Sequence, residues 1–211
     1  MESQFNKVFD IYQKRYESIL DVLYPAKNNT GFTERNLSVN FANAYEATHP
    51  GSVTWYEFQF GEKNNLHYDC IIVNTVKREL VIIESKRFSN VIKKVTEVEA
   101  DIKRINGITN KYRSELVDRI PNLDEYSFVG VILADIWTET KSKTALHKSF
   151  SESAFLREHC SELFKTQDSW FLNGRHFSLD FEDVRESGVY NNDNIRANYH
   201  LIGMIWDINK D

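Results

Sequence analysis

One apolar segment of the sequence ends in charged side chains of the kinds that perform chemistry. The run "ELVIIESKRF", residues 79–88, has the composition of a buried strand, yet it carries Glu84 and Lys86 near its end. Burying an ionised carboxylate is costly unless the carboxylate is paired with a cation or binds a metal ion. Glu84 therefore needs a partner, and Lys86 is one candidate.

A second carboxylate, Asp69, lies in the preceding apolar run, "LHYDCIIVNT". A short polar connection joins the two runs, so they predict neighbouring antiparallel strands. The start of the first strand then lies beside the end of the second, which brings Asp69 near Glu84 and Lys86. Strand alternation places Glu84 and Lys86 on one face and Ser85 on the other. The sequence thus predicts that two carboxylates and one lysine converge at one edge of a sheet.

The acid-x-lysine spacing is not specific by itself, since it recurs at Asp101 to Lys103 and at Glu139 to Lys141. Only the copy at Glu84 closes an apolar strand that follows an acid-bearing strand. The alternative interpretation is a structural contact between Glu84 and Lys86 at a strand end, where charged residues commonly emerge into water.

Hydrophobic periodicity predicts the elements that position these residues. Apolar residues at helical spacing predict an N-terminal helix within residues 1–24 and a second helix that starts after Thr33. The segment "SVTWYEFQF" predicts a strand before the two described above, so that three strands form an antiparallel meander. Helical spacing returns from Asn90, and the continuous apolar run "YSFVGVILADIW" is typical of a central strand covered on both faces. A helix between two strands favours a crossover connection.

The last third of the chain predicts further elements. They are a helix around residues 150–163, a hairpin "SWFLNGRHFSL" with a tight turn at Asn173 and Gly174, and a last strand "YHLIGMIWDI". We therefore expect a single α/β domain over residues 1–211, with its core at about 33–137 and a C-terminal extension over 140–211.

Composition limits the class of protein. With 211 residues, of which 41% are hydrophobic and 13% aromatic, the chain is ordinary for one globular domain. It contains no apolar stretch of the roughly 18 residues that span a bilayer. Its N-terminus is charged and amphipathic, and its two cysteines show no metal-binding spacing. These features predict a cytoplasmic protein that has no membrane partner.

The net charge of −5 argues against binding nucleic acid by bulk attraction. It does not exclude a local basic surface, because basic residues outnumber acids between Lys86 and Arg119. A solvated helix face is the alternative explanation of that charge asymmetry.

The order of helix, three strands, helix and strand, with Asp69 and the triplet Glu84-Ser85-Lys86, resembles the PD-(D/E)XK nuclease superfamily. The resemblance covers about residues 33–137. It implies a restriction-endonuclease-like αβββαβ core, with a central mixed sheet flanked by helices. Tyr68 precedes Asp69 where the family signature has proline, a position that often varies in the family.

The resemblance implies a metal-dependent deoxyribonuclease that hydrolyses phosphodiester bonds with Mg²⁺, for which Mn²⁺ can substitute. Asp69 and Glu84 would bind the metal through their carboxylates and Ser85 through its backbone carbonyl, while Lys86 would orient or activate the attacking water. Hard oxygen ligands suit Mg²⁺, which neutralises transition-state charge and helps to generate hydroxide near pH 7. Whether Lys86 itself takes a proton depends on how far its pKa is lowered.

The family often adds a glutamate from the helix before the first strand, and the candidates are Glu34 and Glu46. At 100° per residue Glu34 falls within the helix's apolar stripe, whereas Glu46 points away from it. We therefore expect Glu34 to be the additional catalytic, metal-binding residue. Its alternative role is that of a first-turn carboxylate that interacts with the helix dipole.

Other residues are weaker candidates. On strand alternation His67 shares the face of Asp69, with a satisfied structural histidine as its alternative role. Glu57 and Gln59 give the strand "SVTWYEFQF" one unusually polar face, and both are candidates to reach the site. The candidate phosphate contacts are Arg87, Lys94 and Arg104, for which a solvated helix flank is the alternative where they lie in the helix.

Three functions remain open at this point. The first is a DNA endonuclease linked to defence or DNA processing, and the preference for DNA over RNA comes from the resemblance alone. The second is a catalytically silent module of the same fold that binds nucleic acid or a protein partner. The third is a subunit that becomes active only with a partner. A homodimer is also compatible, because dimers are common where such a fold cuts both strands.

Overall fold

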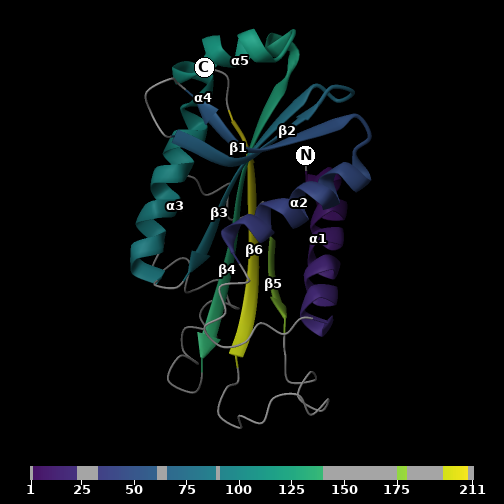
Figure 1. Cartoon of the computed structure of the whole chain (residues 1–211), viewed down its shortest axis with the longest axis vertical. Helices are drawn as coiled ribbons and strands as arrows, with labels where there is room; N and C mark the ends of the chain where they lie inside the picture. Colours follow the sequence, from purple (N-terminus) through teal and green to yellow (C-terminus); the bar gives the residue numbers. More distant parts are fainter. Residues whose placement is uncertain are drawn as a thin grey trace.

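The computed structural model describes residues 2–22, 33–60, 66–88, 91–139, 175–179 and 197–208. The chain is an α/β protein in which a mixed sheet is flanked by helices (Figure 1). The described strands form one six-stranded sheet in the order β1-β2-β3-β4-β6-β5. The helices are α1 (Glu2–Val22), α2 (Glu34–Thr48), α3 (Val91–Asn106), α4 (Ile108–Lys111), α5 (Arg113–Arg119) and the 3-10 turn η1 (Leu123–Glu125). The strands are β1 (Ser52–Phe60), β2 (Leu66–Asn74), β3 (Glu79–Phe88), β4 (Ser127–Glu139), β5 (Arg175–Leu179) and β6 (Ala197–Asp207).

The predicted meander and crossover are both confirmed. Strand β1 pairs antiparallel with β2, and β2 pairs antiparallel with β3, where Cys70 lies opposite Ile83. Strand β4 pairs parallel with the whole length of β3, and Glu84 lies opposite Ile132. A parallel neighbour requires a crossover, and α3 to α5 supply it.

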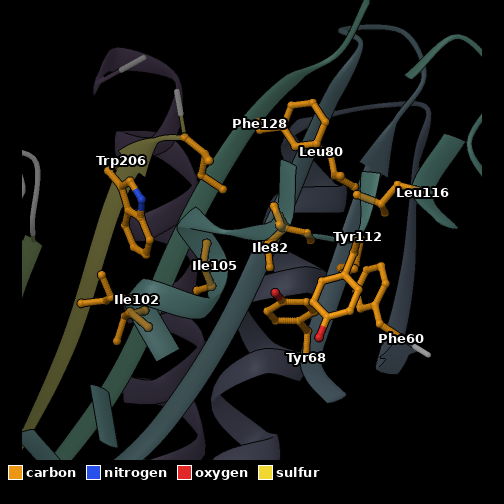
Figure 2. Close-up of a cluster of buried hydrophobic side chains, with 14 of the residues drawn as sticks. Phe60, Tyr68, Leu80, Ile82, Ile102, Ile105, Tyr112, Leu116, Phe128 and Trp206 are labelled. Atoms are coloured by element: carbon orange, nitrogen blue, oxygen red, sulfur yellow. The ribbon is translucent and has the colours of Figure 1, made fainter. Parts of the chain in front are cut away.

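Two apolar layers hold the sheet, one on each face. Alternation along β3 sends Leu80 and Ile82 into the layer under α3, which Figure 2 shows with Ile102, Ile105 and Tyr112. The intervening Val81 and Ile83 enter the layer under α1 and α2. Because β3 is buried on both faces, it carries no polar side chain between Glu79 and Glu84.

Helix α1 packs against the sheet at a position that leaves no room for a side chain. A Cβ added to Gly203 on β6 would collide with the Phe9 ring of α1. We expect Gly203→Ala to lower the free energy of unfolding by about 1–3 kcal/mol, measured by urea denaturation. Gly107→Ala is the matched control, because its Cβ would meet only ordinary contacts, the nearest at 3.4 Å from the Lys103 carbonyl oxygen. Equal stabilities of the two variants would contradict this packing.

The C-terminal end of α2 buries a histidine. The His49 ring stacks on Tyr45 at 4.2 Å between centroids, and its Nδ1 lies 2.6 Å from Thr48 Oγ1. Burial, with a smaller contribution from Lys77, lowers the pKa of His49 below its ordinary value of 6.5.

This histidine predicts a pH dependence of stability. The folded state binds the His49 proton less tightly than the unfolded state, so between the lowered pKa and pH 6.5 stability rises with pH. When the pH is lowered from 7.5 to 5, we expect His49→Gln to lose less free energy of unfolding than the wild type. Urea denaturation of both proteins at the two pH values measures these losses. Parallel pH profiles for the two proteins would count against the assignment.

Several features differ from the sequence-based expectation. The short helices α4 and α5 and the turn η1 were not predicted between α3 and β4; each is too short to show a helical period. The predicted helix at 150–163 and the first half of the predicted hairpin lie outside the described residues. The second half of that hairpin is β5, which pairs antiparallel with β6, so the predicted last strand is confirmed. None of the described helices has both the length and the apolar character needed to cross a membrane.

Candidate active site

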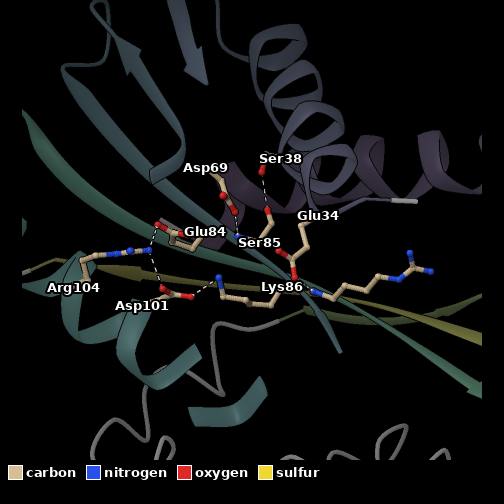
Figure 3. A network of polar contacts seen from close by, with 9 residues as sticks. Glu34, Ser38, Asp69, Glu84, Ser85, Lys86, Asp101 and Arg104 are labelled. Atoms are coloured by element: carbon tan, nitrogen blue, oxygen red, sulfur yellow. Dashed lines mark hydrogen bonds and ion pairs between the residues drawn. The ribbon is translucent and has the colours of Figure 1, made fainter. Parts of the chain in front are cut away.

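The last residues of β3 present their side chains to helices on opposite faces of the sheet (Figure 3). On one face the Ser85 hydroxyl lies 2.7 Å from the hydroxyl of Ser38 on α2. On the other face Glu84 and Lys86 meet residues of α3. The predicted division of these three side chains between the two faces is confirmed.

Four charged side chains form a chain of ion pairs between β3 and α3. One guanidinium nitrogen of Arg104, Nη2, contacts the Glu84 carboxylate and also lies 2.8 Å from Asp101 Oδ1. Asp101 Oδ2 in turn lies 2.8 Å from Lys86 Nζ. The candidate pairing of Glu84 with Lys86 is therefore replaced by two pairings across to α3. Residues Asp101 and Arg104 are three apart on one helix face, which lets both reach β3.

Asp69 bridges the point at which β2 and β3 separate. The backbone pairing of the two strands ends at Cys70 of β2 and Ile83 of β3. Asp69, the next residue of β2 beyond this pairing, accepts a hydrogen bond of 2.6 Å at its Oδ2 from the Ser85 N–H. The predicted proximity of Asp69 to the end of β3 is confirmed. The Asp69 side chain thus takes the place of a backbone hydrogen bond between β2 and β3. We call the point where these two strands separate the fork.

The alternation of β1 and β2 changes face beside this fork. Cys70 packs in the layer under α2, whereas Tyr68 packs in the layer under α3, although the two residues are two positions apart and would share a face in a regular strand. On β1, Tyr56 and Phe58 divide between the same two layers, and the intervening Glu57 has a positive φ of 52°. The side chains on either side of Asp69 therefore do not follow one regular pleat.

This change of face alters the place of the weaker candidates on β1 and β2. The expectation that His67 shares the face of Asp69 assumed regular alternation, which is interrupted between Tyr68 and Cys70. His67 is exposed opposite Gln59. Glu57 is exposed, but its charge contributes to raising the pKa of Asp69, so it lies at the border of the site. Gln59 is exposed, and its backbone carbonyl accepts a hydrogen bond from Arg119.

The two candidate glutamates of α2 lie at opposite ends of the helix. Glu34 Oε1 accepts a hydrogen bond of 2.8 Å from the Arg87 N–H at the end of β3, and its charge contributes to raising the pKa of Asp69. Glu46 instead accepts a hydrogen bond from Thr54 on β1. The structure brings Glu34, the preferred candidate, to the carboxylates of the site.

The three candidate phosphate contacts occupy different positions. Arg87 is half-buried at the end of β3, and Lys94 belongs to α3 with a side chain outside the described part of the structure. Arg104 is 25% exposed, and its guanidinium lies 5.2 Å from the centroid of the Tyr68 ring. Because Arg104 pairs with Glu84, it belongs to the site itself and not to a solvated helix flank.

Burial and like charges shift the protonation of the carboxylates. Burial raises the pKa of Glu84 to about 9, helped by the nearby Asp69 and opposed by Arg104. Burial also raises the pKa of Asp69, against the effect of the Ser85 N–H and of Lys86. The charge of Asp69 thus makes ionisation of Glu84 less favourable, as expected when two carboxylates share one site.

Lys86 keeps its proton in this arrangement. Burial lowers the pKa of Lys86, but the ion pair with Asp101, together with the charges of Glu84 and Asp69, outweighs burial and leaves the pKa above its usual value. The side chain is therefore an ammonium ion near neutral pH. It is suited to fix negative charge and not to accept a proton.

The donor types at the end of β3 suit a hard divalent cation. The carboxylates of Glu34, Asp69, Glu84 and Asp101 lie around this strand end, together with the cationic side chains of Lys86 and Arg104. Carboxylate and carbonyl oxygens are the ligands that Mg²⁺ prefers. In the described part of the chain, no group of three or more His, Cys, Asp or Glu side chains is close enough to enclose an ion. Glu84 would have to exchange Arg104 for the ion.

Comparison of the chain with protein-family models, with curated proteins and with solved structures gave no match.

Proposed function

We propose that this chain is a restriction-endonuclease-like domain that hydrolyses phosphodiester bonds of nucleic acid, DNA in particular, with the help of Mg²⁺. The order α2, β1 to β3, α3 and β4, with β4 parallel to β3, supports this fold assignment. In this proposal α1 and the strands β5 and β6 extend an αβββαβ core.

The observation that carries the proposal is the fork between β2 and β3. Asp69 lies at the point where the strands separate, hydrogen-bonded to the residue that follows Glu84. Lys86 lies two residues further along the same face of β3 as Glu84. Two carboxylates and an ammonium group thus gather, largely buried, at the end of β3, where an ordinary strand end would release its charges into water.

In this proposal the residues of the site have different roles in metal binding and catalysis. Asp69, Glu84 and the Ser85 carbonyl would hold the metal ion, with Glu34 as the additional carboxylate. When bound, Mg²⁺ supplies positive charge to the phosphate and a water of lowered pKa. Lys86 places a fixed ammonium group beside the position of the attacking water, and Asp101 orients that group.

One observation favours the alternative of a silent binding module. The charged groups of β3 already have partners on α3, because Arg104 compensates Glu84 and Asp101 compensates Lys86. Such internal pairing is what a scaffold without bound metal would need. The same pairing also fits the third function, a subunit that becomes active only with a partner, because a partner that shifts α3 away from β3 would release Glu84 and Lys86.

Cleavage of single-stranded and double-stranded DNA by the purified protein tests the proposal. We expect cutting with Mg²⁺ or Mn²⁺ and none with EDTA. Asp69→Asn should abolish cutting, whereas the matched variant Asp124→Asn, which alters an exposed ion pair with Arg113, should cut normally. Absence of cutting on both substrates with either metal would favour the binding module.

A further inference from the structure

Arg104 lies between two carboxylates and an aromatic ring, with part of its guanidinium buried. Its Nη2 contacts both the Glu84 and the Asp101 carboxylates, and its guanidinium packs near the Tyr68 ring. Its Nε is buried and has no hydrogen-bond partner among the described residues. The guanidinium therefore has a donor left over after it has bound both carboxylates.

Arg104 and a metal ion would compete for the same carboxylate. The Glu84 side chain is 2% exposed, and its Oε1 already contacts the guanidinium. A divalent cation on that carboxylate would lie within a few ångströms of the guanidinium, where two positive charges repel strongly. Occupation by one therefore weakens binding of the other.

Asp101 provides a place for the guanidinium to remain. Its carboxylate contacts Arg104 and Lys86 at the same time, at 2.8 Å in each case. If Glu84 releases Arg104, the ion pair with Asp101 can keep the guanidinium at the site. A guanidinium held by one carboxylate can direct its remaining donors to a phosphate group.

We propose that Arg104 is the internal counter-ion of Glu84, that a divalent cation displaces it, and that Arg104, retained by Asp101, then positions the phosphodiester of the substrate. This inference rests on the proposed metal-dependent function. It assigns Arg104 and Asp101 as positioning residues. It also makes metal and nucleic acid bind cooperatively, because a phosphate that draws Arg104 away leaves Glu84 free for the cation.

Titration of the protein with Mn²⁺ in the absence of nucleic acid tests the displacement. We expect Arg104→Gln to bind Mn²⁺ with a Kd about tenfold lower than that of the wild type, with Arg104→Lys between them. A merely structural role predicts an unchanged or higher Kd, since loss of the ion pair would loosen the site. Arg113→Gln, which removes an exposed arginine paired with Asp124, is the control and should leave the Kd unchanged.

A second measurement uses the wild-type protein, so that it does not depend on the folding of a variant. The NMR signal of the Arg104 Nε–H, assigned with the help of Arg104→Lys, should shift when the wild-type protein is titrated with Mg²⁺ in the absence of Mn²⁺. A signal that is unchanged at saturating Mg²⁺ would overturn the inference.

The outcomes separate this inference from the proposed function. Wild-type protein that cuts DNA, combined with equal Mn²⁺ affinities of wild type and Arg104→Gln, refutes the counter-ion role alone. Tighter Mn²⁺ binding by Arg104→Gln without DNA cleavage by the wild type supports the counter-ion role and removes the nuclease. Wild-type protein that binds neither metal contradicts both.

Discussion

Replacing Lys86 with alanine is expected to lower the kcat of metal-dependent DNA cleavage by about 10²–10³-fold. The reason is electrostatic, because the ion pair with Asp101 keeps Lys86 protonated and points its ammonium group along the face that carries Glu84. Negative charge grows on the phosphate and on the attacking oxygen as the reaction proceeds. A fixed positive charge at that place stabilises the transition state more than the ground state.

The measurement is a comparison of kcat and KM for wild type and Lys86→Ala at saturating Mg²⁺. We expect the loss in kcat with little change in KM, because the interaction develops in the transition state. Lys103→Ala, an exposed lysine of α3, serves as the control and should cut like the wild type. Full activity of Lys86→Ala would remove the catalytic assignment of this residue.

Replacing Glu84 with glutamine is expected to abolish cleavage and at the same time to stabilise the metal-free protein at alkaline pH. Burial raises the pKa of Glu84 from 4.5 to about 9, so the folded state binds the proton more tightly than the unfolded state. Between these two values the stability of the wild type falls as pH rises, and the full contribution is present only below pH 4.5. Glutamine has no such titration and can still accept a hydrogen bond from Arg104.

We therefore expect Glu84→Gln to exceed the wild type in free energy of unfolding by about 1 kcal/mol at pH 8, with a smaller difference at pH 5. Urea denaturation at the two pH values, with EDTA present, measures both differences. The control is Glu46→Gln, whose carboxylate is exposed at the other end of α2. A Glu84→Gln protein that is less stable than the wild type at pH 8 would show that the ion pair with Arg104 outweighs the cost of burial.

Local sequence patterns are enough to predict the path of the chain around the site. The period of two in "ELVIIESKRF" divides Glu84 and Ser85 between opposite faces, and the structure has them there. The short connection before this strand forces an antiparallel neighbour, so Asp69 had to lie near its end. The apolar stripe of α2 distinguished Glu34 from Glu46, because helical geometry converts spacing into direction. These results follow from local periodicity and short links, which depend on few distant contacts.

Which charged side chains form ion pairs depends on the packing of the helices against the sheet. Glu84 pairs with Arg104 and Lys86 with Asp101, and both pairings depend on where α3 crosses β3. The position of that crossing depends on apolar residues that are distant in the sequence and pack together in the layer between α3 and the sheet. The spacing of charged residues therefore does not predict it. The change of face beside Asp69 is likewise a non-local adjustment, in which β1 and β2 turn together where β3 separates from them. Local pattern places side chains on elements, whereas the pairing of buried charges is settled by how the elements pack.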